Sequence, residues 1–78
     1  MLAGELYFYD TNEEVIEEMD VIDYEKMSKV EFLELVEKLG CFKVTIHMYN
    51  FGGQIKPTIQ TIYEQGKDIE LPWYLRLK

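Results

Sequence analysis

The residues whose types could support catalysis are few. Cys41 is the only cysteine and His47 is the only histidine. A catalytic thiol needs a nearby base and an electropositive setting, and His47 stands six residues further on in a different element. Gly52-Gly53 lacks the Lys-Ser/Thr pair and the helix start of a phosphate-binding loop. We therefore expect no catalytic residue and no enzymatic activity, with Cys41 as a small packing residue and Gly52-Gly53 in a turn.

Acidic residues are concentrated in the N-terminal third of the chain. Residues 1–25 hold nine Asp and Glu and no Lys or Arg, whereas residues 26–78 hold six acids and eight bases. The acidic run lacks the Asp/Asn/Gly alternation of a calcium loop, so we expect neither a metal site nor a cofactor. Contacts with phosphate groups require a cationic surface, so we expect no direct binding of nucleic acid or membrane.

The same charge distribution favours a protein partner with a basic surface, or a basic face on another copy of the chain. A solvated surface that binds nothing is an equally good explanation of the acidic run. If the run does bind a partner, the residues that would contact it are Glu13, Glu14, Glu17, Glu18 and Asp20.

Aromatic residues form a second candidate surface. Six of them exceed what the core of a 78-residue chain can bury, and Tyr and Trp are enriched at interface centres. These six are Tyr7, Tyr9, Tyr49, Tyr63, Trp73 and Tyr74. We predict a contact patch where Tyr7, Tyr9 and Tyr49 share the outer face of a sheet, and burial under a loop is the alternative.

The elements that position these residues are clearest between residues 21 and 49. Residues 21–24 have extended character. Ser28 and Glu31 have the spacing of a capping box, and Gly40 can adopt the left-handed conformation that ends a helix. Four apolar residues at helical spacing follow Ser28, which predicts a main helix over about residues 29–39. They are Phe32, Leu35, Val36 and Leu39. Alternating apolar residues from Phe42 to Met48 then predict a strand with one buried face.

The remaining segments leave alternatives open. Residues 5–9 predict a strand with Leu6 and Phe8 on one face. Residues 13–20 suit a helix or a strand, and we expect a strand that returns as a hairpin into residues 21–24. Residues 57–65 suit a short helix near 58–65 or an edge strand. Alternation from Ile69 to Leu77 predicts a closing strand that begins around Pro72.

Length and composition indicate one domain over residues 1–78. One cysteine excludes an internal disulfide and points to a reducing compartment, so we expect an intracellular protein of the cytoplasm or nucleus. No apolar run approaches the ~20 residues of a membrane span, and Met1 opens no signal-peptide pattern.

The segment from Asp23 to Glu31 has the pattern Asp-x-acid-x-hydrophobic-Ser-x-x-Glu, and it leads into a helix closing in Leu39-Gly40 and an Ile46-to-Tyr49 strand. Over roughly residues 20–53 the chain resembles the plant PB-one-like domain, a relative of the Phox/Bem interaction domain. The resemblance implies a ubiquitin-like β-grasp: a hairpin, a helix, further strands and a final strand beside the first, in a mixed sheet. It also implies protein–protein association, often at the N-terminus of plant proteins related to Mutator-type transposases.

We therefore expect a non-enzymatic interaction module with an acidic face, in homo- or hetero-association. The alternative is an assembly or regulatory domain of a transposase-related, DNA-acting protein. A ubiquitin-like modifier is less favoured, because the end Leu75-Arg76-Leu77-Lys78 lacks the Gly-Gly through which such modifiers are conjugated. Related domains pair a Lys on the first strand with an acidic motif, and the first strand here, Glu5 to Asp10, has no Lys.

Overall fold

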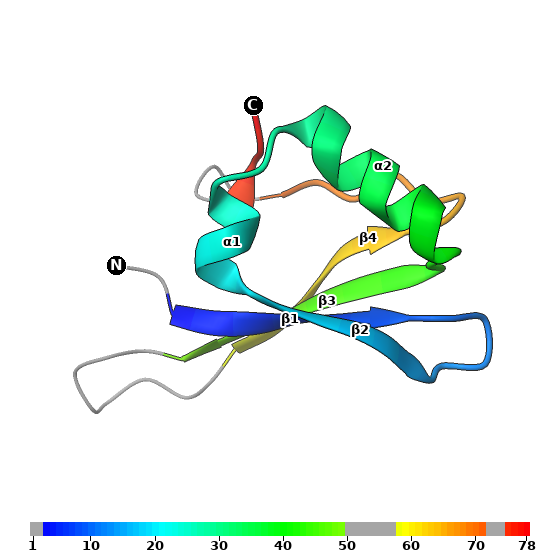
Figure 1. Cartoon of the computed structure of the whole chain (residues 1–78). Coiled ribbons are helices and arrows are strands. Elements are labelled where there is room, and N and C mark those ends of the chain that lie inside the picture. The colour runs from blue at the N-terminus through cyan, green and yellow to red at the C-terminus, as the bar shows by residue number, and fades with distance from the viewer. Residues whose placement is uncertain (1–2, 50–57, 72–74) are drawn as a thin grey trace.

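The structure is a computed structural model, and it describes residues 3–49, 58–71 and 75–78. Two helices lie on one side of a four-stranded sheet (Figure 1), which confirms the α+β class. In chain order the elements are β1 (Ala3–Tyr9), β2 (Val15–Asp20), α1 (Val21–Glu25), α2 (Lys29–Leu39), β3 (Lys43–Tyr49) and β4 (Thr58–Glu64).

The strand order across the sheet is β2-β1-β3-β4, and every neighbouring pair is antiparallel. The expected mixed sheet is therefore wrong for the strands that the structure describes. β1 has β2 on one side and pairs with β3 over all seven of its residues on the other. Gly4 permits this pairing, because a side chain there would overlap the backbone carbonyl oxygen of His47. The resemblance implies a final strand beside the first strand, but in this structure β3 occupies that position.

The main helix is where the sequence predicts it. The Ser28 side chain accepts a hydrogen bond from the Glu31 backbone N–H at 3.1 Å, and the Glu31 carboxylate accepts one from the Ser28 N–H at 3.1 Å. Gly40 ends the helix with φ 66°. Phe32 and Val36 are buried against the sheet, with Leu35 and Leu39 half-buried beside them. The helix begins and ends on local signals.

Residues 21–24 are helical, so the prediction of a strand there is wrong. The Asp20 carboxylate accepts a hydrogen bond from the Ile22 N–H at 2.8 Å and caps the five-residue α1. Val21 and Tyr24 are buried, whereas Ile22 between them is exposed. That spacing of three is helical, and it brings both buried side chains onto the sheet. The strand predicted over residues 13–20 is confirmed as β2.

The alternative of an edge strand is correct for residues 58–64, and the short helix predicted near 58–65 is wrong. β4 pairs with β3 from Lys43↔Glu64 to Met48↔Thr58. Its Thr, Ile and Tyr residues favour strands, and β3 would otherwise have an unpaired edge. The β4 strand ends at a turn in which Gly66 has φ 81°.

The closing strand predicted for residues 69–77 is absent from the described part of that segment, residues 69–71 and 75–77. Pro72, Trp73 and Tyr74 lie outside the described residues, as does the turn predicted at Gly52-Gly53. The described residues 75–78 lie instead on the helix side of the sheet, where the Lys29 N–H donates to the Lys78 carbonyl at 2.7 Å. β1 is paired on both sides, so this segment finds no place beside it; Leu75 is buried in the core instead, with Leu71 and Leu77 half-buried against it.

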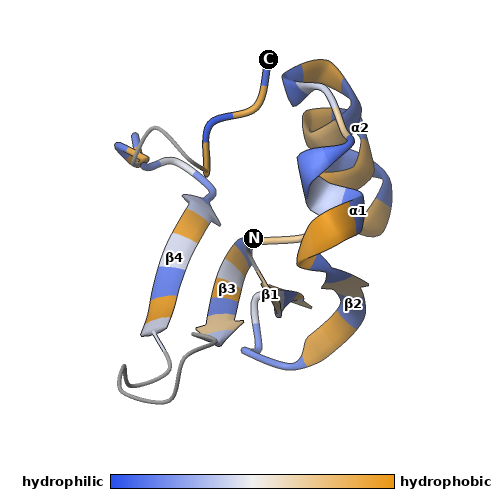
Figure 2. Cartoon of the chain, turned by 90° about the vertical axis from the view of Figure 1, so that its left-hand side faces the viewer, coloured by the Kyte–Doolittle hydropathy of each residue, from blue (hydrophilic) through white to orange (hydrophobic). Residues whose placement is uncertain are grey.

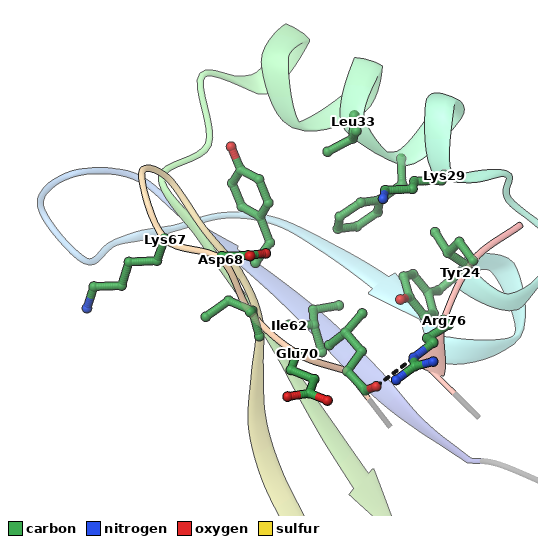
Figure 3. A pocket seen from close by; sticks show the side chains of 13 residues that line it. Tyr24, Lys29, Leu33, Ile62, Lys67, Asp68, Glu70 and Arg76 are labelled. Carbon is green, nitrogen blue, oxygen red and sulfur yellow. Dashed lines mark hydrogen bonds between the residues drawn. The ribbon is translucent and has the colours of Figure 1, made fainter. Parts of the chain in front are cut away.

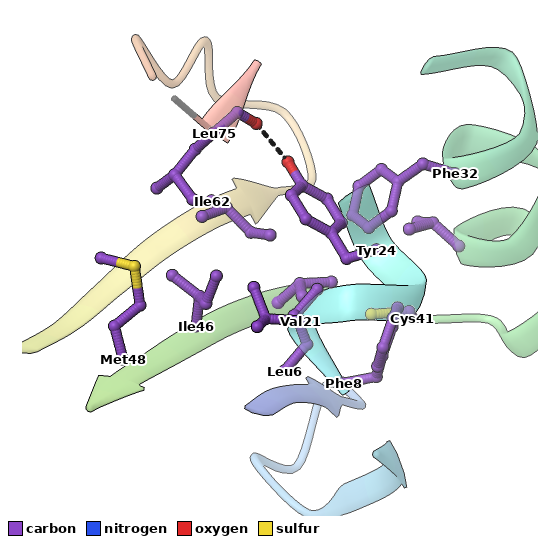
Figure 4. Close-up of a cluster of buried hydrophobic side chains, with 12 residues drawn as sticks. Leu6, Phe8, Val21, Tyr24, Phe32, Cys41, Ile46, Met48, Ile62 and Leu75 are labelled. Carbon is purple, nitrogen blue, oxygen red and sulfur yellow. Dashed lines mark hydrogen bonds between the residues drawn. The ribbon is translucent and has the colours of Figure 1, made fainter. Parts of the chain in front are cut away.

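The buried apolar residues form one cluster between the helices and the sheet (Figure 4). Phe32 is its centre: its ring lies 5.5 Å from Tyr24, 6.2 Å from Phe8 and 6.3 Å from Tyr63, measured between ring centroids. Leu75 closes the cluster from the C-terminal segment, and its carbonyl accepts a hydrogen bond from the Tyr24 hydroxyl at 2.5 Å.

Because Ser28 caps α2, we expect Ser28→Ala to make the fold less stable. Removal of the side-chain oxygen leaves the Glu31 N–H without its acceptor, so the free energy of unfolding should fall by about 1 kcal/mol in urea denaturation. Ser28→Asp keeps a capping oxygen and should lose little. Equal losses in the two variants would show that the cap is not the cause.

The buried Tyr24 hydroxyl should make the free energy of unfolding depend on pH in the alkaline range. Burial raises the pKa of Tyr24 from its ordinary value of 10 to about 12. The unfolded chain therefore ionises first, so the stability that depends on neutral Tyr24 is complete below pH 10 and is lost as the pH rises from 10 to 12.

Tyr24→Phe should cost about 1 kcal/mol at neutral pH through the lost hydrogen bond, and it should make stability fall less steeply above pH 10. Denaturation at neutral and alkaline pH measures both effects. Tyr49→Phe, at an exposed position, is the control and should change neither. An alkaline decline as steep in Tyr24→Phe as in the unmodified chain would contradict the role of Tyr24.

Candidate functional site: the outer face of the sheet

The face of the sheet directed away from the helices carries most of the residues singled out by the sequence. Residues that oppose one another on neighbouring strands point to the same side, and the register places three rows of four residues across this face. The rows are Asp20, Glu5, His47 and Ile59; then Glu18, Tyr7, Thr45 and Thr61; then Val15, Tyr9, Lys43 and Glu64. We call these twelve residues the outer face.

Tyr7 lies at the centre of the outer face and contacts two of its members. Its hydroxyl donates a hydrogen bond to Oε2 of Glu5 at 2.6 Å. Its ring meets the His47 ring nearly edge-on, with centroids 4.5 Å apart and planes at 70°. The hydrogen bond to the Glu5 carboxylate is the main reason that the pKa of Tyr7 is raised to about 12. Tyr7 is therefore a neutral hydrogen-bonding group at physiological pH.

Tyr9 is joined to Thr45 on the same face. The Thr45 hydroxyl donates to the Tyr9 hydroxyl oxygen at 3.4 Å, and Thr45 is buried even though it lies on the outer face. Tyr49 opposes Ala3 beyond the three rows and is 47% exposed. The predicted grouping of Tyr7, Tyr9 and Tyr49 on one face is thus what the register shows.

The five acidic candidates are divided by the structure. Glu18 and Asp20 lie on the outer face beside Tyr7 and Glu5. Glu17 opposes the buried Phe8 and so belongs to the other face, although it is exposed at the sheet edge.

Glu13 and Glu14 lie in the turn between β1 and β2. That turn is held by Asp10, whose carboxylate accepts from the N–H groups of Asn12 and Glu14 at 2.8 and 3.0 Å. Glu13 there has φ 64°. Glu13 and Glu14 therefore lie next to the first residue of β2 and add negative charge there, but they are not part of the sheet.

Several residues of the outer face were not among the sequence-based candidates, and Glu5, Thr45 and Lys43 are the polar ones at its centre. Alternation along β1 and β3 could have indicated them. Glu5 alternates with the apolar Leu6, and Lys43 and Thr45 alternate with Val44 and Ile46, so all three belong to the face away from the core. Which face each strand presents follows from alternation. Which residues become neighbours depends on the antiparallel pairing of β1 with β3, which the sequence did not predict.

A hollow of about 400 Å³ lies between α2 and the C-terminal segment (Figure 3). Tyr24, Phe32 and Ile62 line it from the core, and charged residues of both signs surround them. Lys67 is paired with Glu64 at 2.9 Å, and Arg76 Nε donates to the Leu71 carbonyl at 2.8 Å. These two cations already have partners, and the remaining charges, Lys29 against Asp68 and Glu70, select no particular ligand.

Cys41 has the environment of a packing residue. It is buried, and its thiol donates to the Lys43 carbonyl at 3.1 Å. Burial raises the pKa of the Cys41 thiol, which is the opposite of what a thiolate nucleophile requires. His47 lies on the outer face against Tyr7. Within residues 3–49, 58–71 and 75–78, no group of three or more His, Cys, Asp and Glu could hold a metal ion.

Among the described helices, α1 and α2 are both too short to cross a membrane. A scan against protein-family models found no match, and searches of the curated proteins and of the solved structures found none either. The resemblance to the PB-one-like domain stays a prediction.

The contact between Tyr7 and Glu5 predicts that Glu5→Gln lowers the pKa of Tyr7 from about 12 toward 10. A neutral amide accepts the hydroxyl proton without the negative charge that opposes ionisation. An alkaline titration followed by NMR of the tyrosine rings measures the change. Glu18→Gln is the control, because Glu18 opposes Tyr7 but contributes least to its shift. If Glu5→Gln leaves the Tyr7 titration unchanged, the hydrogen bond does not hold the hydroxyl in solution.

Proposed function

We propose that this chain is a non-enzymatic protein-interaction module that binds a partner with a basic surface through the outer face. The observation that carries the proposal is the position of the acidic strand β2 directly beside the tyrosines of β1. Glu18 opposes Tyr7, and Asp20 opposes Glu5. Carboxylates of β2 thus lie beside Tyr7 and Glu5 of β1 on a face that no helix of the described residues covers (Figure 1).

The charges explain why the partner should be basic. All nine acids of residues 1–25 are unaccompanied by Lys or Arg, and they belong to β1, β2, α1 and the adjoining turns. Such a field attracts a cationic surface over several ångströms and raises its association rate. Lys43 is the one Lys or Arg among the twelve residues of the outer face, against the four acids Glu5, Glu18, Asp20 and Glu64, so the face remains negative overall.

The tyrosines supply apolar contact area, which the charged side chains do not. A tyrosine side chain offers a large rigid apolar surface with a polar tip, which is why it is frequent at the centres of interfaces. Tyr7 and Tyr9 are already held in place by Glu5 and Thr45. Their ordering therefore costs less conformational entropy on binding than that of free side chains.

A relation to β-grasp interaction domains is supported by the order of a hairpin, a helix and a further strand, with the helices on one face of the sheet. The antiparallel pairing of β3 directly beside β1 departs from it. A role in assembly within a transposase-related plant protein depends on the resemblance alone, and an intracellular location depends on the single cysteine.

Binding of a Lys- and Arg-rich peptide tests the proposal. Glu14→Gln/Glu18→Gln removes two charges at the outer face and its adjoining turn. Exposed ion pairs contribute about 0.2–1 kcal/mol each, so the dissociation constant should rise roughly twofold to thirtyfold at low salt. Binding of the unmodified chain should weaken as salt is added. Fluorescence anisotropy of the labelled peptide measures both changes.

The matched control is Glu34→Gln/Glu37→Gln, which removes the same charge from exposed positions on α2. It should leave the affinity nearly unchanged. In NMR spectra the peptide should shift the backbone signals of Tyr7, Thr45 and His47 more than those of α2. Equal weakening by the two double variants would mean that only net charge matters and would contradict a site on the outer face.

A further inference from the structure

The two edges of the sheet differ in chemistry. β2 forms one edge and β4 forms the other, at opposite ends of the strand order (Figure 2). A strand at a sheet edge presents backbone N–H and C=O groups that can pair with another strand. Proteins commonly protect such edges with charged side chains and bulges. Both edge strands in this chain have an irregularity in their pairing, but only β2 carries several charged side chains.

The β2 edge is protected. Glu17, Glu18 and Asp20 occupy three of its six positions, and a bulge interrupts its pairing with β1 near Tyr9. Glu13 and Glu14 add two more carboxylates at the start of the strand. Any strand that approached this edge would meet a row of negative charges, so another copy of the chain would be repelled.

The β4 edge has little of this protection. No charged side chain occurs from residue 58 to residue 63, and Glu64 at the end is paired with Lys67 at 2.9 Å. Ile59 lies on this edge strand with 65% of its surface exposed. The irregularity in the pairing with β3 lies beyond Thr61, so it leaves residues 58–61 in regular register. Within the described residues no other strand lies beside β4.

We propose that the β4 edge is a self-association site, at which β4 of one copy pairs antiparallel with β4 of a second copy. A two-fold axis makes such an interface self-complementary, since each strand offers the other the same uncharged residues. The two four-stranded sheets then become one continuous sheet of eight strands, and Ile59 of each copy is covered near the junction.

The charge distribution selects a second copy over the basic partner of the outer face. A cationic surface gains nothing at β4, because the acids of residues 1–25 lie on the other half of the sheet. Two copies that meet through β4 keep those acids at the two far ends of the joined sheet. Meeting through β2 would instead bring five carboxylates from each copy together, namely Glu13, Glu14, Glu17, Glu18 and Asp20.

This self-association goes beyond the proposed function and can be measured without any partner. A single pair of seven-residue strands buries less than the ~1,600 Å² of a standard interface, so the dimer should dissociate in the micromolar to millimolar range. Each copy carries a net charge of −7. Added salt screens the repulsion between copies and should therefore strengthen the dimer, whereas it weakens binding of a basic partner.

Sedimentation equilibrium of the full chain over a wide concentration range tests the proposal. We expect a monomer–dimer equilibrium that shifts toward dimer as salt is added. Ile59→Lys adds a charge to each of the paired edges and should raise the dissociation constant at least about tenfold, because lysines on edge strands oppose edge-to-edge pairing. NMR at increasing concentration should shift the backbone signals of β4 before those of β2.

The matched control is Val15→Lys, which places the same charge at an exposed branched residue of the other edge, on the same face. It should leave the dissociation constant of the dimer within about twofold. Circular dichroism of both variants verifies that they are folded. A monomer at every concentration, a dimer unaffected by Ile59→Lys, or equal weakening by the two lysines would each overturn the proposal. Failure of this test leaves the peptide-binding result of the outer face untouched, so the two outcomes are separable.

Discussion

The packing of the Phe32 ring is the interaction on which the other elements depend. Phe32 projects from α2 and meets Phe8 of β1, Tyr24 of α1 and Tyr63 of β4. These rings come from segments that are distant in sequence, so one side chain joins the hairpin, both helices and the edge strand. Tyr24 then extends the arrangement through its hydroxyl, which holds the Leu75 carbonyl and with it the C-terminal segment. In a chain of this size, few other contacts are available to replace these.

Because the core lies entirely between the helices and the sheet, the other face of the sheet is left for side chains with another role. Leu6, Val44 and Ile46 are completely buried on the helix side. Their neighbours along the same strands therefore point away from the core. Burial on one face thus orders a row of tyrosine, histidine and acidic side chains on the other, and the rigidity of that row derives from the core behind it.

Local signals in the sequence were sufficient for α2 and for the alternation of β1 and β3. They failed where tertiary contacts decide. Residues 21–24 have strand-forming side chains, but the Asp20 cap and the burial of Val21 and Tyr24 make them helical. By local pattern, residues 58–64 suited either a short helix or an edge strand, and pairing with β3 makes them a strand. The tyrosines of the outer face could be grouped by alternation, whereas the proximity of Glu5, Tyr7 and His47 depends on a register that no local pattern specifies.

The position of the acidic residues matters more than their number. Net charge alone would describe this chain as uniformly repulsive toward copies of itself. The structure instead shows Glu17, Glu18 and Asp20 on one edge strand, while the strand at the opposite edge has a single carboxylate that is already paired with Lys67. Two of the residues that protect the β2 edge from strand addition, Glu18 and Asp20, thus also belong to the outer face that we propose for a basic partner. One cluster of side chains can therefore determine both which edge stays closed and which face is open to binding.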